Sequence, residues 1–506
     1  MSELLIELFS EEIPANLQES SVKTFELMML NNFKEEGLNY NKSEVYWSPM
    51  RLTLCVEGMD SKSKDISINK RGPRFDANDS AINGFARGLE VNKSDLIVEE
   101  TEKGKFYFYK NLKKGTSAEI IIENAIKDII VSFPWKKSMR WGSNNLKWIR
   151  PLHNILCIFD GKPIKFNIDS LKSNSLTNGH RYLAANSISI SNKEDYINQL
   201  LKANVIINPK ERKEAIINSG KKLTNKAGLN FNPNENLLDE VCNIVEFPFL
   251  FIGSFDAEYL SLPEPILELT MIKQQKYFPL YKKDGSLSKK FMGVSNIPVS
   301  DNLNIISGNE RVLKARLSDA RFFYDNDIKK GLIKLSESLK NIIFHRSLGT
   351  MEDKIIRVNY IVSKYSECFK ANSKLAITAA KLCKADLCSE VVYEMPELQG
   401  IIGSIYASEK NYPQEVSIAI KEQYSPLGPS DKCPSIPESA ILSFSDKIDS
   451  LVGFIAMDMK ATGSKDPFGL RRSCLGIIRI IIEKRIRISI IDVINASYAS
   501  YENQNI

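Results

Sequence analysis

The chain has 506 residues, which is too long for one hydrophobic core and predicts two to four domains. Its composition, 43% hydrophobic and 26% charged, is ordinary for a globular protein and excludes a disordered or fibrous chain. The net charge of +6 is mild over this length, so it permits an anionic partner without requiring one.

The chain shows no sign of export or of membrane insertion. Its eight cysteines are scattered without C-x-x-C pairs or zinc-finger spacing, so reduced thiols are expected. The first residues, MSELLIELFSEEIP, have no basic region and are broken by glutamates, unlike a signal peptide. The most apolar run, residues 474–494, carries too many charges to span a membrane. We expect a cytoplasmic protein with no membrane partner.

The first third of the chain alternates between strand and helix patterns. Residues 71–74, RGPR, predict a turn, because Pro73 disfavours the helical backbone for Gly72. In chain order, the patterns predict a strand, a helix, a strand pair, a short helix, a hairpin and a further helix: residues 3–14, 15–37, 45–59, 80–89, 103–115 and 117–133.

The character of the chain changes near residue 330. Before it, helical and extended patterns alternate, and after it the patterns are helical with short breaks. The expected fold class is therefore α+β, with a mixed N-terminal body followed by an all-helical domain. We expect domains over residues 1–330 and 331–460, and a helical segment over 461–506.

One segment near this boundary predicts an amphipathic helix, GNERVLKARLSDARFFYDND, residues 308–327. Leu313, Leu317, Ala320 and Tyr324 share its apolar face. Arg311, Lys314, Ser318 and Arg321 share another face. A solvated surface is the commoner meaning of such a face. The alternative is a basic stripe along a nucleic-acid backbone.

Two other segments combine basic residues with apolar ones. In SMRWGSNNLKWIRPLHN, Trp141 and Trp148 alternate with basic residues. This pattern fits a surface that stacks on unpaired RNA bases and a strand pair with Trp in the core equally well. In SKDPFGLRRSCLGIIRIIIEK, residues 464–484, Asp466 can cap a helix with Pro467 at its first position. A packed helix with solvated arginines is favoured there over an RNA or subunit contact.

The motifs that bind nucleotide phosphates, and the motif that presents a nucleophilic serine, are missing from the sequence. It has no G-x-x-x-x-G-K-[ST] loop, no G-x-G-x-x-G after a strand and no G-x-S-x-G elbow. Its adjacent glutamates need not face one another. We therefore expect no catalytic residue and no bound cofactor in this chain.

The stretch KLCKADLCSE, residues 381–390, raises the question of an HD-type metal centre. Such a centre needs two His and two Asp around a divalent metal, and the chain has three His in all. The candidates are His345, Asp386 and Asp446, but Ala385 stands where the adjacent His would be. A metal with one imidazole and two distant carboxylates would be held weakly, so we expect no metal site.

Many segments, taken in order, resemble one known family, the β subunits of bacterial heterotetrameric glycyl-tRNA synthetase. No single motif decides this, but the resemblance is collinear over nearly the whole chain. The segments are LLIELFSEEIP, SMRWG, WIRPLHNILCIF, NGHRYLA, VEFPFLFIGSF, ERVLKARLSDARFFYDND, LGTMEDK, KADLCSEVVYEMPELQGIIGSIYA, SDKIDSLVGF and GSKDPFGLRR.

The resemblance implies an α2β2 enzyme that joins glycine to tRNA(Gly). ATP, with Mg²⁺, would be used in the α subunit, which holds the catalytic site. The β subunit would bind and position tRNA, and its helical domain over 331–460 would be HD-like without the metal chemistry. Family members continue beyond residue 506 into an anticodon-binding domain, so 461–506 is expected to lead towards that domain.

On this basis, basic residues of the N-terminal body are the candidate contacts to tRNA phosphates and riboses, which position RNA without reading its sequence. Two alternatives remain open: a metal-dependent HD-type phosphohydrolase and a non-catalytic RNA-binding scaffold. The candidate contacts are Arg71, Arg74, Arg87, Lys137, Arg140, Arg150, Arg181, Arg311, Lys314 and Arg321.

Overall fold

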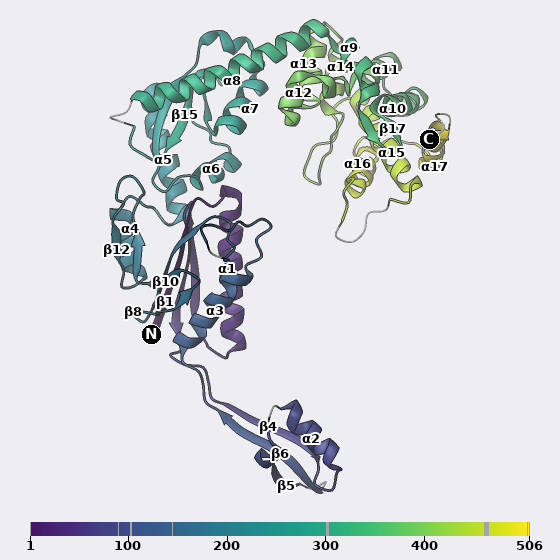
Figure 1. Ribbon diagram of the computed structural model, residues 1–506. Helices are drawn as coiled ribbons and strands as arrows, with labels where there is room; N and C mark the ends of the chain where they lie inside the picture. The colour runs from purple at the N-terminus through teal and green to yellow at the C-terminus, as the bar shows by residue number, and fades with distance from the viewer. Residues whose placement is uncertain are drawn as a thin grey trace. The chain divides into compact units, whose positions relative to one another are not determined.

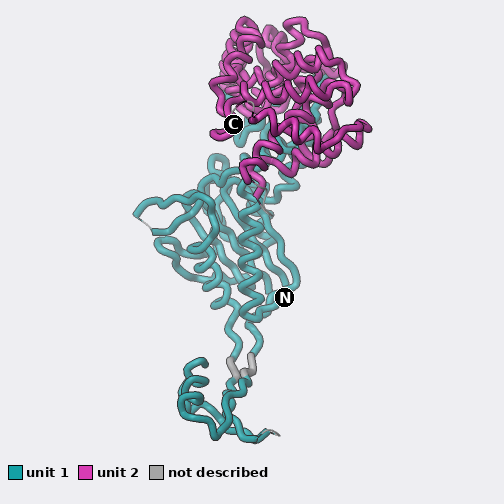
Figure 2. Tube along the Cα trace, turned by 90° about the vertical axis from the view of Figure 1, so that its right-hand side faces the viewer, with its two compact units in different colours: residues 1–252, 292–306 teal, residues 253–291, 307–506 magenta. Residues whose placement is uncertain are grey.

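The structure is a computed structural model that describes residues 2–89, 91–101, 104–143, 145–299, 303–459, 465–502 and 504. It divides into two compact units, which Figure 2 shows in different colours. Unit 1 comprises residues 1–252 and 292–306, and unit 2 comprises residues 253–291 and 307–506.

A seven-stranded sheet is the centre of unit 1 (Figure 1). Its order is β2-β3-β1-β7-β10-β9, with β8 paired to β7. The ladder is antiparallel apart from β10, which runs parallel to β7. The strands are β1 (Ser2–Ser10), β2 (Lys42–Ser48), β3 (Arg51–Met59), β7 (Leu152–Phe159), β8 (Lys162–Pro163), β9 (Asn167–Ile168) and β10 (Leu171–Asn174).

Both faces of this sheet are covered, because alternate residues of β1 point to opposite sides. Leu4 and Ile6 pack in the core that the sheet forms with α1 and α3. Leu5 packs with Tyr196 of α4 on the other face. The predicted first strand and first helix are confirmed. The helices of unit 1 are α1 (Ala15–Glu35), α2 (Asp79–Gly88), α3 (Ala118–Ser132), α4 (Lys193–Lys202), α5 (Pro209–Ala227) and α6 (Glu235–Cys242).

A three-stranded antiparallel sheet of order β4-β6-β5 carries α2 on one face (Figure 1). The predicted turn at RGPR is wrong. These residues are the end of β4, where the pairing with β6 shifts between Arg71 and Arg74. Because β4 is an edge strand, Pro73 removes no bond from the middle of the sheet. The strands are β4 (Ile66–Arg74), β5 (Ile97–Thr101) and β6 (Gly104–Lys113).

Between residues 170 and 330 the chain also forms two small sheets, the helices α7 and α8 and a π-helix. β11 pairs with β12, and a three-stranded sheet has the order β13-β15-β14. In α8, Leu313, Leu317 and Ala320 are buried, so the predicted apolar face is confirmed. The elements are β11 (Leu176–Asn178), β12 (Ser187–Ser189), β13 (Phe249–Ser254), α7 (Glu264–Leu269), a π-helix (Thr270–Gln274), β14 (Phe278–Tyr281), β15 (Leu287–Ser295) and α8 (Leu303–Lys330).

From residue 332 the chain is helical, and its helices pack around one core that includes Ile441, Phe444 and Ile448 of α15. The strand pair of β16 (Ile343–His345) and β17 (Gly349–Thr350) departs from the all-helical prediction. The α+β fold class with a helical C-terminal region is otherwise confirmed. The helices are α9 (Leu332–Glu337), α10 (Met351–Tyr365), α11 (Ser373–Leu382), α12 (Glu390–Glu394), α13 (Ile401–Glu409), α14 (Gln414–Glu422), α15 (Pro437–Ala456), α16 (Leu470–Glu483) and α17 (Ile490–Glu502).

The start of α16 differs from the prediction by three residues. The helix begins at Leu470, not at Pro467, because Gly469 precedes it with a left-handed backbone, φ 65°. Asp466 still caps the helix, since its carboxylate accepts the backbone N–H groups of Leu470 and Arg471.

The domain limits expected from the sequence stay predictions. The chain passes from one compact unit to the other after residues 252, 291 and 306, and the last of these boundaries lies within α8. The expected limit near residue 460 falls on residues 460–464, outside the described residues. All eight cysteines are free thiols. Within the described ranges, no helix combines the length and apolarity needed to cross a membrane.

Candidate functional site

Two of the candidate basic residues meet on the small sheet of unit 1. The guanidinium of Arg71 lies 3.6 Å from the centre of the Phe106 ring, and that of Arg74 lies 5.9 Å from it. Both arginines are exposed. Arg74 is also 3.6 Å from Asp76. Arg87 is exposed in the last turn of α2. The structure therefore brings Arg71 and Arg74 together and leaves Arg87 on the neighbouring helix.

The tryptophan-rich segment between α3 and β7 separates its aromatic residues from its basic ones. Trp148 is fully buried, with ring centres 5.1 Å from Phe133 and 5.0 Å from Trp135. Lys137, Arg140 and Arg150 are exposed. The core interpretation therefore holds for Trp148, which is not available to stack on bases.

Arg181 is held by carboxylates of its own unit. Its guanidinium pairs with Glu11 and lies 3.0 Å from Glu12. His153 is 2.9 Å from the same Glu11 carboxylate. The hydrogen bond from His153, followed by that from Arg181, holds the pKa of Glu11 below its usual range. RNA would have to compete with these glutamates for Arg181.

The three candidates on α8 differ in their contacts. Lys314 is 2.7 Å from Asp256. Arg321 donates to the backbone oxygen of Glu258 and to Ser261, at 2.6 and 2.7 Å. Arg311 is exposed and forms no ion pair with any described residue. Of this predicted stripe, Arg311 has the charge most available to a phosphate.

Asp386, one of the degenerate HD positions, caps a helix. Its carboxylate accepts the backbone N–H groups of Gly400 and Gly403, at 2.5 and 3.0 Å, where α13 begins. Burial raises the pKa of Asp386 to about 6, against these hydrogen bonds. Ala385 beside it is fully buried. This carboxylate serves the fold and has no imidazole next to it.

Asp446 lies between lysines. Its Oδ1 is 3.4 Å from Nζ of Lys354 and 3.2 Å from Nζ of Lys384, and all three residues are nearly buried. Burial by itself would raise the pKa of Asp446, but Lys354, Lys384 and Lys447 together hold it below its usual range. Ammonium groups therefore stand next to the oxygen that a metal would need.

A second buried carboxylate, Asp449, lies one helical turn further along α15. It is 3.0 Å from Lys354 Nζ and accepts from Arg357 Nε at 2.7 Å. Lys447 instead donates to the backbone oxygens of Tyr424 and Ser425, at 2.9 and 3.1 Å. Burial lowers the pKa of Lys447 to about 8.

His345 is the remaining degenerate HD position, and it packs among aromatic rings. Its ring centre is 5.5 Å from Phe454 and 6.1 Å from Phe468. Its Nδ1 accepts the backbone N–H of Ser347. Within the described part of the chain, no group of three or more His, Cys, Asp and Glu side chains is placed to hold a metal ion.

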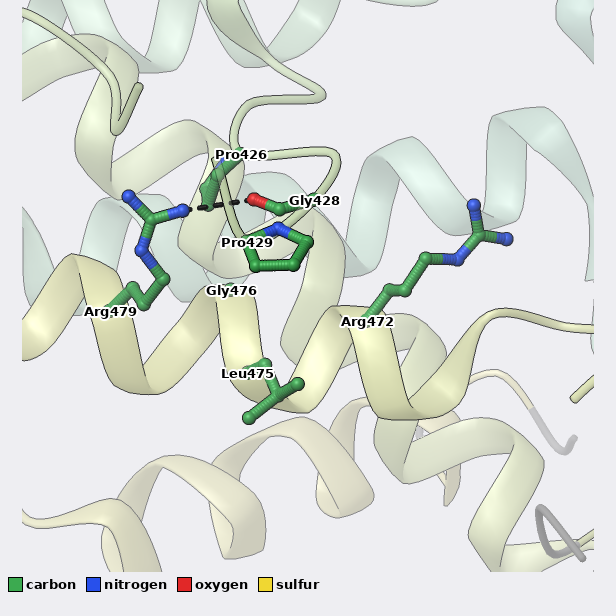
Figure 3. Close-up of a pocket in the computed structure, with 7 residues that line it drawn as sticks. All are labelled: Pro426, Gly428, Pro429, Arg472, Leu475, Gly476 and Arg479. Carbon is green, nitrogen blue, oxygen red and sulfur yellow. Dashed lines mark hydrogen bonds between the residues drawn. The ribbon is translucent and has the colours of Figure 1, made fainter. Parts of the chain in front are cut away.

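The exposed side of α16 borders a small apolar hollow (Figure 3). Its volume is about 150 Å³, which is below the range of about 300–1,000 Å³ usual for small-molecule sites. Arg479 donates to the backbone oxygen of Gly428 at 2.9 Å, so its guanidinium holds the loop in place. The lining residues are Pro426, Gly428, Pro429, Arg472, Leu475, Gly476 and Arg479.

Sequence reasoning missed the buried cations around Asp446 and Asp449. A signal was present: Lys354 and Arg357 are three residues apart, as are Asp446 and Asp449, and this spacing places each pair on one face of its helix. It also missed that Arg51 is buried, paired with Glu7 and Glu246. No pattern marks a single arginine in a strand as buried.

Comparison with known proteins gives a consistent result. The family model described as glycyl-tRNA synthetase beta subunit matches residues 4–506. A glycine–tRNA ligase beta subunit from Ruegeria sp. (strain TM1040) is 40% identical, over 100% of this chain and 75% of the relative. Those of Dinoroseobacter shibae and Paracoccus denitrificans are 39% and 38% identical, over 97% and 96% of this chain and 69% and 72% of theirs.

Proposed function

The chain belongs to the glycyl-tRNA synthetase beta subunit family, and on that premise we propose how it takes part in joining glycine to tRNA. It is a glycine–tRNA ligase subunit that binds and positions tRNA(Gly) for a catalytic alpha subunit. The observation that carries this conclusion is the family match over residues 4–506. The likeness extends through both compact units, so it does not rest on one common domain.

The assembly is proposed to be an α2β2 tetramer that works in the cytoplasm. ATP and Mg²⁺ would be used in the alpha subunit. This chain would contribute orientation: it holds the body of the tRNA so that the 3′ end reaches the partner's reacting groups. Holding reactants in the right geometry lowers the barrier without any bond chemistry in this chain.

The exposed candidate residues are the ones we propose for phosphate contacts. Arg71, Arg74, Lys137, Arg140 and Arg150 are exposed on unit 1, as is Arg87. Arg311 is exposed on α8. Each cation that neutralises a phosphate releases a counterion and strengthens binding at low salt. Arg181, Lys314 and Arg321 would have to exchange contacts within this chain for contacts with RNA.

Hydrolysis of a phosphate ester at an HD-type metal centre is not favoured. Ala385 carries no ligand, and Lys354 and Lys384 stand beside Asp446 where they would repel a divalent cation. The HD-like origin of the helical region remains a proposal from resemblance.

Co-purification tests the proposed partnership. A tagged form of this chain, co-expressed with a glycyl-tRNA synthetase alpha subunit, should retain the alpha subunit and bind tRNA(Gly) in preference to other tRNAs. A chain that binds RNA but retains no alpha subunit would instead be an RNA-binding scaffold, and the proposed function would be wrong.

A further inference from the structure

The small sheet of unit 1 has one face packed against α2 and one face turned away from it. Tyr107 and Tyr109 of β6 pack with Ile82 and Ala86 of α2. Alternate residues of a strand point to opposite faces, so Phe106 and Phe108 lie on the other side of β6. We call that side the open face.

Basic and aromatic residues share the open face. The register pairs Arg71 with Phe108 and Arg74 with Phe106, and directly paired residues of an antiparallel ladder point to the same side. Ile97 of β5 pairs with Phe108 and is 44% exposed. On the open face both arginines lie over Phe106, and Nζ of Lys110 lies 5.8 Å from the centre of the Phe108 ring.

Arg71 covers an aromatic ring on this face. Its guanidinium lies 3.6 Å from the centre of the Phe106 ring, which is only 8% exposed, while Arg71 itself is exposed. No carboxylate among the described residues pairs with Arg71, in contrast to Arg74 with Asp76 and Lys110 with Glu99. A planar cation thus lies over an aromatic ring, with its charge not neutralised by those residues.

The charge of this segment fits a polyanionic partner. Residues 61–116 contain twelve Lys and Arg against eight Asp and Glu, a net charge of +4. The segment is therefore one of the basic parts of the chain, together with residues 134–166, which contain seven Lys and Arg against one Asp.

We propose that the open face binds unpaired nucleotides of the tRNA, with the guanidinium of Arg71 on Phe106 as a stacking platform. Bases stack on guanidinium planes and on aromatic rings, but only where they are not already stacked in a duplex. Phe108 extends the platform, and Arg74 contacts the phosphates. This inference rests on the proposed function, because it specifies how part of the tRNA is held.

Binding measurements on the full chain test the proposal. The probes are tRNA(Gly), a labelled oligoribonucleotide of about ten nucleotides and the same sequence as a duplex. The variants are Arg71→Ala, Arg71→Lys and Phe108→Leu. Lys93→Ala is the matched control, since Lys93 is a cation of the same segment on the α2 side, paired with Asp79.

Arg71→Ala and Phe108→Leu should weaken binding of the single strand about tenfold, with a much smaller effect on the duplex. Arg71→Lys should keep the salt dependence of the wild type but not its affinity, because lysine supplies charge without a planar surface. Lys93→Ala should bind like the wild type. Circular dichroism of each variant checks that the fold is retained.

Three results would overturn the inference alone: Arg71→Ala binding the single strand like the wild type, equal losses for single strand and duplex, or an equal loss in Lys93→Ala. The inference would also be overturned if Arg71→Ala and Phe108→Leu kept their affinity for RNA but no longer bound the alpha subunit, because the open face would then be a protein interface. A wild-type chain that binds tRNA keeps the proposed function intact in all these cases. If the wild type binds no tRNA, both proposals fail.

Discussion

At the scale of single residues, the buried carboxyl groups of the helical region differ in what surrounds them. Asp446 and Asp449 lie beside lysine and arginine side chains, at 2.7–3.4 Å. Asp386 accepts hydrogen bonds from backbone N–H groups, and burial raises its pKa to about 6 against these bonds and the weaker effect of the Lys384 charge. A buried charge with fixed cations stays ionised, whereas a buried charge without them retains its proton to higher pH.

Asp386 should make the stability of the protein depend on pH between about 4 and 6. The folded state keeps the proton up to about pH 6, but the unfolded chain releases it near 3.8. Unfolding therefore releases a proton in this window, and stability falls as the pH rises through it, by roughly 2–3 kcal/mol.

Asp386→Asn removes this titration while keeping an oxygen that can accept from α13. The free energy of unfolding of the wild type minus that of the variant, from urea unfolding followed by circular dichroism, should fall between pH 4 and 6 and stay constant above pH 6. If this difference in unfolding free energy is constant or rises with pH over the window, the pKa of Asp386 is not raised in the folded protein.

Asp449 should be required for the stability of the helical region. Asp449→Asn leaves Arg357 buried without a carboxylate and Lys354 with Asp446 alone, and removing one partner of a buried ion pair costs about 3–5 kcal/mol. Urea unfolding measures the loss. Glu19→Gln is the control, because the Glu19–Lys23 pair is exposed and should contribute little. Equal effects of the two substitutions would contradict the role of Asp449.

At the scale of helices and strands, apolar spacing was a reliable guide and exact starting points were not. The stripe of Leu313, Leu317 and Ala320 on α8 could be read directly, because helical period and burial coincide there. The start of α16 could not be predicted in this way. Gly469 adopts a left-handed backbone, so the helix begins at Leu470, three residues after the predicted start at Pro467.

The buried ion pairs that Lys354 and Arg357 form with Asp446 and Asp449 join residues distant in sequence. The spacing of three marks each pair of residues as sharing a helix face, but it does not report that the two faces meet.

Trp148 should matter for folding and not for RNA. It is fully buried against Phe133 and Trp135, so Trp148→Ala leaves a cavity and should cost about 3–5 kcal/mol. All four tryptophans of the chain lie in unit 1, so tryptophan fluorescence during urea unfolding reports on that unit. Lys147→Ala, an exposed neighbour, is the control. Unchanged stability of Trp148→Ala would contradict the packing.

The basic side of α8 can be tested with two arginines. Arg311→Ala combined with Arg321→Ala should weaken tRNA binding in the assembly with the alpha subunit. The slope of the logarithm of the binding constant against the logarithm of the salt concentration should become shallower by about one to two. Arg316→Ala is the control, since Arg316 is exposed on a different side of the same helix. If the double variant binds tRNA at moderate salt like the wild type, the stripe is solvated and does not contact RNA.

At the scale of the whole molecule, the chain combines a mixed α/β unit with a largely helical one, and the sequence predicted that change of character. Basic residues are gathered in residues 61–116, with a net charge of +4, and in residues 134–166, with a net charge of +6. The carboxylates of the helical region are used as helix caps and ion pairs. These features fit a subunit that binds and positions RNA for chemistry carried out by its partner.

Glycine charging tests this account most directly. The purified chain is mixed with the alpha subunit, tRNA(Gly), ATP, Mg²⁺ and labelled glycine, and the glycyl-tRNA formed is counted against each subunit alone and against a mixture without ATP. The account predicts rapid charging only when both subunits and ATP are present. Charging by the alpha subunit that is unchanged when this chain is added would contradict it.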